Sequence, residues 1–332
     1  MKPEKIEKIR FWMGTKLPKW MYKIAVFFRC LYKEIKMPEK KKSYGELNPD
    51  KTFFVIRLCP PGTGFLANYN YVLGYMKYAF DKGWIPVVDM ENYATLYQEE
   101  EPVNGTRNVW EYFFEQPFDP VTKRRYTLEE VYKSKNVVLA KADDQSMYDS
   151  SLSKEVLEWQ HKMSLLVPFK KDMQEHVDKV ASECLPQNIK VLGVPTRGSE
   201  QKKRVIGHPI AMNVDEILPI VKKKCEEWNI DHVFVKAEEE ETIEYLEKEL
   251  VNIHYSKCVR IRKYNVNKDV NASIAKRTIS KSESLKDYLT DIKILSMCTS
   301  LIGTENNGLT TAVIWNGGKY EHQEVIDNGV WE

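Results

Sequence analysis

An arginine stands close after a short apolar run near the middle of the chain. Residues 189–194 have the composition of a buried strand, and Arg197 and Gly198 follow within residues 196–200. A charge at the end of a buried strand needs a partner, because a lone buried ion is very costly. A diphosphate suits it, since the planar guanidinium matches two phosphate oxygens and Gly198 lets the chain turn. A salt bridge between domains, to a carboxylate such as Asp89, is the alternative interpretation.

Two other loops carry small polar residues that could contact an anion. Gly64 precedes Asn68, and in such a loop backbone N–H groups can approach a phosphate while Asn68 presents an amide donor. Thr304, Asn306 and Asn307 lie between a strand and a helix, where their side chains could donate to phosphate oxygens. An ordinary turn with a capping residue explains either loop equally well.

The residue pattern indicates neither a metal site nor a disulfide framework. No Asp-x-Asp pair is present to hold a divalent cation on a diphosphate. The six cysteines are scattered singly, and none forms Cys-x-x-Cys or combines with histidine at metal-ligand spacing. We therefore expect no metal and no cofactor, and thiols that behave as small hydrophobic groups.

The segments that must position these loops alternate between strand and helix, and 332 residues suffice for two domains. We expect strands at residues 52–58, 85–89, 189–194, 232–236, 252–255 and 300–303. We expect helices at residues 69–80, 153–167, 171–184, 214–228, 242–250 and 285–297, and another starting near Asn307. This order predicts parallel sheets with helices on both faces, and two such domains in tandem place a ligand cleft between them.

The charge of the chain is unevenly distributed. Residues 1–42 contain 13 Lys and Arg against 4 Glu, a net charge of +9, whereas the whole chain carries +2. The other 290 residues therefore sum to −7. A basic arm on a mildly acidic body favours an anionic partner at the arm and does not indicate a nucleic-acid-binding core.

The arm also has a helical pattern. Apolar residues recur at spacings of 4, 4, 3 and 4 between two prolines, with lysines and arginines on both sides, at Trp20, Ile24, Phe28, Leu31 and Ile35. A basic amphipathic helix over residues 18–36 can lie on a membrane surface, or the same face can pack on the body or on a second subunit. No apolar run approaches the ~18 residues that span a bilayer, so we expect a cytoplasmic chain. Peripheral contact with the inner membrane face is one of the two interpretations of the arm.

Several motifs occur in an order that is specific to one family. They are the glycine loop before Asn68 with residues 69–73 (YNYVL), residues 83–90 (GWIPVVDM), 104–106 (NGT) with 110–117 (WEYFFEQP), 193–200 (GVPTRGSE) with 208–210 (HPI), and 295–298 (LSMC) leading into the Gly303 loop. Over most of residues 53–331 the chain resembles the fucosyltransferase-like proteins of bacterial surface-polysaccharide loci, which belong with the α-1,6- and protein O-fucosyltransferases.

The resemblance implies a GT-B-like α/β fold, in which two Rossmann-like domains face each other across a cleft. The expected division is an arm at residues 1–42, an acceptor-side domain at 43–185 and a nucleotide-sugar-binding domain at 186–332. It implies a GDP-sugar donor, usually GDP-fucose, a glycan acceptor that can be lipid-linked, and metal-independent inversion. By the same resemblance Arg197 binds phosphate, Asn68 belongs to the amino-terminal loop, and residues 304–307 form the carboxy-terminal phosphate loop.

The chain departs from the family pattern at three places. The run Arg-Gly-Thr-Asp of the family is Arg-Gly-Ser-Glu here, ending at Ser199 and Glu200, and Asn306-Asn307 stands where serines are common. The base-reading turn has three glutamates, of which Glu239 could accept from guanine N1–H and N2–H₂. Acids in the first turn of a helix also favour the helix dipole and need no ligand.

The general base is the least determined role. Glu200 is a candidate for accepting a proton from the sugar hydroxyl, and His208 is a second, although a capping role before Pro209 explains His208 as well. A non-catalytic relative that binds a GDP-sugar or a glycan, or a transferase that uses another nucleotide-sugar, are the alternatives.

Overall fold

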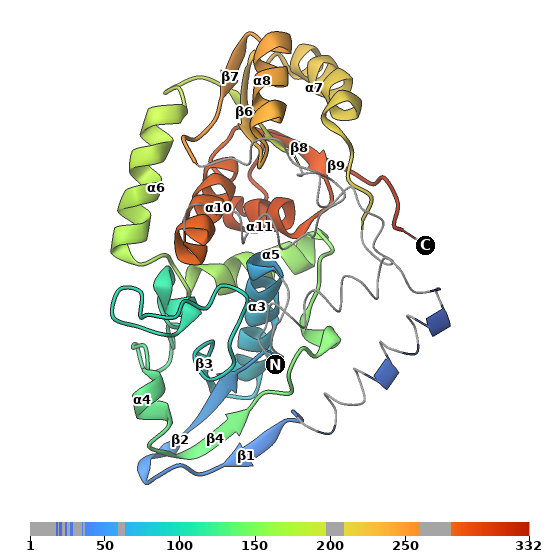
Figure 1. Cartoon of the computed structure of the whole chain (residues 1–332). Coiled ribbons are helices and arrows are strands. Elements are labelled where there is room, and N and C mark those ends of the chain that lie inside the picture. The colour runs from blue at the N-terminus through green and yellow to red at the C-terminus, as the bar shows by residue number, and fades with distance from the viewer. Residues whose placement is uncertain are drawn as a thin grey trace. The chain divides into compact units, whose positions relative to one another are not determined.

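The computed structural model describes residues 18, 20, 21, 24, 27, 28, 35, 37–58, 64–196, 209–258 and 280–331. The chain forms two compact units: unit 1 contains Trp20–Lys171, and unit 2 contains Asp172–Glu332 (Figure 1). The predicted boundary at residues 185 and 186 lies one helix later, because α6 (Lys171–Cys184) groups with unit 2.

Unit 1 is built on a four-stranded sheet in the order β1-β4-β2-β3 (Figure 1). The parallel strands are β2 (Leu47–Ile56), β3 (Ile85–Val88) and β4 (Ser134–Leu139), and β1 (Lys40–Lys42) runs antiparallel to β4. The last three residues of the predicted arm, 40–42, therefore belong to the sheet of unit 1. Three lysines form the outer strand of the sheet, where their charge discourages pairing with another chain.

Both faces of this sheet are covered. On one face Phe53, Val55, Val87, Val137 and Leu139 form a core with Tyr126. On the other face lies α3 (Phe65–Asp81), whose Tyr75 and Tyr78 pack on Phe54 together with Trp84. Three further helices of unit 1 have only three or four residues: η1 (Val109–Tyr112), α4 (Leu128–Val131) and η2 (Gln145–Met147). The longer helix α5 (Lys154–Leu165) comes after the last strand of the sheet in the chain.

Unit 2 is built on a five-stranded sheet in the order β7-β6-β5-β8-β9, and all four strand pairs are parallel. The strands are β5 (Val191–Pro195), β6 (His232–Lys236), β7 (Asn252–His254), β8 (Ser300–Thr304) and β9 (His322–Ile326). The predicted α/β class with mainly parallel sheets is confirmed. The strand order is that of a doubly wound sheet.

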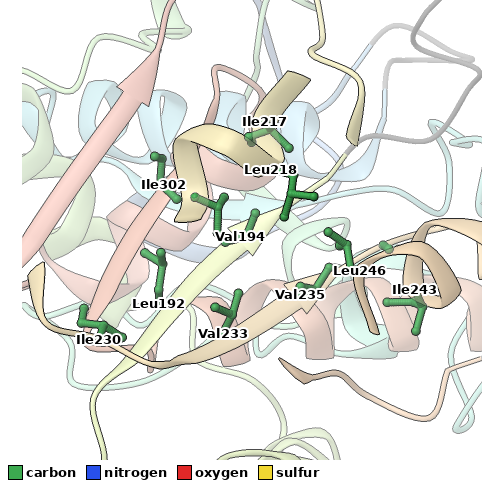
Figure 2. Packing of buried hydrophobic residues seen from close by; sticks show 12 residues of the cluster. Leu192, Val194, Ile217, Leu218, Ile230, Val233, Val235, Ile243, Leu246 and Ile302 are labelled. Atoms are coloured by element: carbon green, nitrogen blue, oxygen red, sulfur yellow. The ribbon is translucent and has the colours of Figure 1, made fainter. Parts of the chain in front are cut away.

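Helices cover both faces of the sheet of unit 2. Ile217, Leu218 and Val221 of α7 (Val214–Trp228) and Ile243 and Leu246 of α8 (Glu240–Glu249) pack on one face. Figure 2 shows Leu218 above Val194 of β5. On the other face a side chain at Gly193 would meet Leu295 of α10 (Lys281–Leu295), and one at Gly303 would meet Leu309 of α11 (Asn307–Asn316). The site therefore rests on a sheet that is packed on both sides.

The arm is described at only a few positions. Residues 20, 21, 24, 27, 28 and 35 are helical, and Trp20, Phe28 and Ile35 are 64%, 61% and 66% exposed. The amphipathic helix predicted over residues 18–36 otherwise lies outside the described residues. Among the residues that the structure describes, no helix is long and apolar enough to cross a membrane.

Candidate functional site

The topology of unit 2 marks one place on its sheet as a binding site. In a doubly wound sheet, ligands bind at the carboxyl ends of the two strands between which the chain reverses its direction of winding. Those strands are β5 and β8, which end at Pro195 and Thr304. The sequence places Arg197 two residues after the end of β5. Its loop, with the predicted site residues Arg197, Gly198, Ser199, Glu200 and His208, lies outside the described residues.

The exit of the chain from β5 is fixed by Thr196. This residue is buried, and both its backbone nitrogen and its Oγ1 donate to the carbonyl oxygen of Lys236, at 2.8 and 3.0 Å. The loop that carries Arg197 therefore starts against the end of β6.

Asn306 is the N-cap of α11. Its Oδ1 accepts from the backbone N–H groups of Gly308 and Leu309, at 2.9 and 3.0 Å, and its Nδ2 donates to the carbonyl oxygen of Thr304 at 2.8 Å. The capping interpretation thus accounts for this side chain. The turn still directs the positive end of the α11 dipole toward the carboxyl edge of the sheet, where negative charge is favoured.

The turn from β8 to α11 is tightly packed. A Cβ atom added at Gly308 would lie 2.9 to 3.0 Å from Ile292 Cδ1, Asn306 Oδ1 and Tyr288 Oη. Thr304 is buried, and Asn307 begins α11 with its carbonyl oxygen accepting from Thr311. The predicted residues Thr304, Asn306 and Asn307 are therefore held together at the end of β8.

Lys236 and Tyr288 belong to this edge but were not predicted. Lys236 is the last residue of β6 and is buried, with its Nζ 2.8 Å from Glu238 Oε1 and 5.1 Å from the ring centroid of Tyr288. The Tyr288 hydroxyl in turn reaches the start of α11 at Gly308. The argument applied to Arg197, that a charge at the end of a buried strand needs a partner, would have identified Lys236 as well.

Glu239 lies between β6 and α8, where its backbone is extended at the N-cap position of α8. Its side chain does not cap the helix; its Oε2 accepts from Thr242 Oγ1 at 3.5 Å, and the residue is only 9% exposed. The dipole of α8 already has Glu240 and Glu241 in its first turn. Because β5 lies between β6 and β8, Glu239 and Thr304 flank the point at which the Arg197 loop leaves the sheet.

The predicted residues Gly64 and Asn68 belong to unit 1, and the helix there begins earlier than expected. Gly64 is the N-cap of α3, its φ of −55° suits any residue, and a Cβ atom there would meet nothing within 4 Å. Asn68 lies inside α3 and is buried, because the helix begins at Phe65 and not near residue 69. Asn68 therefore does not cap the helix.

Asp89 is fully satisfied within unit 1. Its Oδ1 accepts from the backbone N–H groups of Glu91 and Asn92, at 3.1 and 2.9 Å, and its Oδ2 accepts from Asn92 Nδ2 at 2.9 Å and Tyr132 Oη at 2.6 Å. Burial, followed by the charge of Asp89, raises the pKa of the Tyr132 phenol, which therefore stays a donor. Asp89 thus has its partners within unit 1 without Arg197.

No family model matches the chain, and no curated protein matches it. Among solved structures, the chain is similar to the fucosyltransferase NodZ from Bradyrhizobium at 12% identity and a TM-score of 0.49, over 79% of this chain and 92% of that one. It is similar to POFUT1 in its apo form at 10% identity and a TM-score of 0.45, over 85% and 99%. It is also similar to a mutant of Arabidopsis thaliana FUT1 in complex with GDP, at 10% identity and a TM-score of 0.45, over 98% and 79%.

Proposed function

We propose that this chain is a glycosyltransferase that moves a sugar, with fucose as the first candidate, from a GDP-sugar to a glycan acceptor. One observation carries the proposal: the motif that resembles the family's phosphate-binding run follows β5 at the reversal point of a doubly wound sheet. The turn between β8 and α11 follows the strand that neighbours β5 in the same sheet. A diphosphate at that edge would meet Arg197 from one strand and the end of a helix from the next.

Arg197 and α11 supply fixed positive charge in this proposal. Charge develops on the β-phosphate as the sugar leaves, and without a metal it must be met by donors that are already in place. The Arg197 guanidinium offers two parallel hydrogen bonds, and the α11 terminus adds its dipole. Thr304 and Asn307 are the predicted residues of this turn that we assign as further donors. Glu200 is the residue of the Arg197 loop that we assign as general base for inversion.

Glu239 is the residue that we assign to the nucleobase. It follows β6, the neighbour of β5, and its carboxylate is held in a buried place. A carboxylate accepts from both guanine N1–H and N2–H₂, whereas uracil and adenine do not present this pair of donors. Guanine recognition would therefore require a carboxylate at this position, and an amide of the same shape would not replace it.

The proposal also includes the acceptor and the place of the reaction in the cell. The family resemblance favours a glycan of a surface polysaccharide, carried on a lipid at the inner membrane face. The exposed apolar residues of the arm and its basic charge fit a peripheral contact with anionic lipids.

A thermal-shift panel of GDP, UDP, ADP and CMP, combined with GDP-fucose turnover, tests the assignment. We expect GDP to stabilise the protein by about 2.7 kcal/mol at a hundredfold excess over its dissociation constant, and UDP not to do so. Glu239→Gln should remove the preference for GDP, since its amide places a donor against the guanine donors. Equal shifts with GDP and UDP would reject the guanine assignment, and GDP binding without turnover would indicate a non-catalytic relative.

A further inference from the structure

Unit 1 contains a pocket lined by three tyrosines and an asparagine. Tyr44, Asn92, Tyr93 and Tyr132 surround a cavity of about 360 Å³. Tyr44 follows β1, Tyr132 follows α4, and the other two residues follow β3, so three separate segments converge there. The pocket opens to solvent, with Tyr44 38% exposed. Ligand pockets range from ~300 to 1,000 Å³, so this one has room for a single small ring.

Two of the residues that line the pocket, Asn92 and Tyr132, are held in place by Asp89. The carboxylate accepts from the side chains of Asn92 and Tyr132 and from two backbone N–H groups of the same loop. Two of the four lining residues are thus fixed by one buried group. A site whose polar groups are fixed before binding loses less conformational entropy when a ligand enters.

Three polar groups of the residues that line the pocket have no hydrogen-bond partner among the described residues. Within the part of the chain that the structure describes, no hydrogen bond engages the hydroxyl groups of Tyr44 and Tyr93 or the Oδ1 of Asn92. Each hydroxyl can both donate and accept, and the amide oxygen accepts. This set matches the hydroxyl groups of a sugar, which also donate and accept.

The aromatic rings and their neighbours argue against a charged ligand. Lys42 Nζ lies 5.4 Å from the ring centroid of Tyr44, and Arg57 Cζ lies 5.4 Å from that of Tyr93. These cations already occupy ring faces that a cationic ligand would need. Arg57 in turn is bound to the carbonyl oxygens of Pro38 and Ala140, at 2.7 Å each, so it does not turn toward an anion. The lining itself is uncharged.

We propose that this pocket binds a neutral sugar ring, and that the ring belongs to the acceptor glycan; the second step rests on the proposed function. Tyrosine combines an apolar ring with a polar hydroxyl, and a pyranose ring likewise combines C–H groups with hydroxyl groups. The pocket would hold one sugar unit through ring contacts and through the three groups named above.

Saturation-transfer NMR on the full chain tests the proposal, with the methyl glycosides of glucose, galactose, mannose and N-acetylglucosamine as probes. We expect at least one glycoside to bind the parent protein. Tyr44→Ala should weaken its binding by about three- to tenfold, the range for loss of one aromatic contact. Tyr93→Phe keeps the ring and the contact with Arg57 but removes the hydroxyl, and it should weaken binding as well. Tyr245→Ala, at a tyrosine of unit 2 with 37% exposure, is the matched control and should change nothing.

Absence of saturation transfer from the parent to every probe would overturn the proposal, and so would undiminished binding in both pocket variants. GDP thermal shifts on the same preparations separate this proposal from the proposed function. Glycoside binding that depends on Tyr44 and Tyr93, without any effect of GDP, would support the sugar pocket and reject the transferase. A GDP shift without glycoside binding would reject the pocket alone.

Discussion

At the scale of single residues, charges at strand ends explain what the sequence could and could not reveal. Asp89, Lys236 and Arg197 each follow or end an apolar run, so the sequence shows that each needs a partner. The partner itself depends on loops that only the folded chain brings near. Asp89 finds Asn92 and Tyr132, and Lys236 finds Glu238 and Tyr288.

Replacing Arg197 tests whether its partner is a ligand. Arg197→Ala should lower GDP-fucose turnover by ~10²–10³, the typical cost of losing one fixed donor to a developing negative charge. Arg197→Lys keeps the charge but loses the bidentate geometry, so it should also be impaired. Melting temperature and turnover are measured on the same preparations. A variant that melts well below the parent yet turns over donor normally would show that Arg197 has a structural role.

At the scale of elements, segments with strong periodicity and clear ends were predicted well. The predicted helices at 171–184 and 214–228 coincide with α6 and α7, and the predicted strands of unit 2 lie within two residues of β5 to β8. The missed strands were β1, β4 and β9. Of these, β1 and β9 are outer strands rich in polar residues, whose pairing depends on a neighbour and not on a local apolar pattern.

The start of α11 offers a matched test of helix packing. Gly308→Ala forces a Cβ atom to within about 3 Å of three side chains, so we expect a loss of about 1–3 kcal/mol in the free energy of unfolding. Gly64→Ala, at the N-cap of α3, meets nothing within 4 Å and should be close to neutral. Chemical denaturation measures both. An equal change in the free energy of unfolding for the two variants would mean that the turn after β8 can relax around a side chain. That result would contradict the claim that this turn is tightly packed.

The strands β6 and β7 give the fold a dependence on pH. His232 Nδ1 and His254 Nε2 lie 2.8 Å apart, at hydrogen-bond distance. One ring must donate and the other must accept, so at least one of the two rings must be neutral. Burial, and then the neighbouring His232, lower the pKa of His254. The neutral form is thus favoured in the folded state, so its contribution is complete above the ordinary pKa of about 6.5 and is lost as the pH falls below that value. His254→Gln should therefore flatten the decline of melting temperature between about pH 6.5 and 5; an unchanged slope would contradict this.

At the scale of the whole molecule, the sequence predicted two α/β units and a basic arm, and the two units of the folded chain meet at residues 171 and 172. The arm ends earlier than residue 42, because Met37 accepts from the backbone N–H of Ala142, Pro38 accepts from Arg57, and residues 40–42 pair with β4. A short run of three lysines resembles a linker in sequence. Its role as a strand follows only from the neighbouring strand.

Two truncations test the arm and its boundary together. Removing residues 1–36 keeps the hydrogen bonds of Met37 and Pro38 and the pairing of β1 with β4, so the shortened chain should melt near the parent. Removing residues 1–42 also removes β1 and opens the edge of β4, so that chain should lose stability and associate. The first truncation should no longer sediment with anionic liposomes. The intact chain should do so, and salt should weaken its binding, because surface charge is screened over ~10 Å at 0.1 M. Aggregation of the first truncation would instead show that Trp20, Phe28 and Ile35 cover an apolar surface of the body or of a second subunit. Removing the arm would expose that surface, and large exposed apolar surfaces favour association.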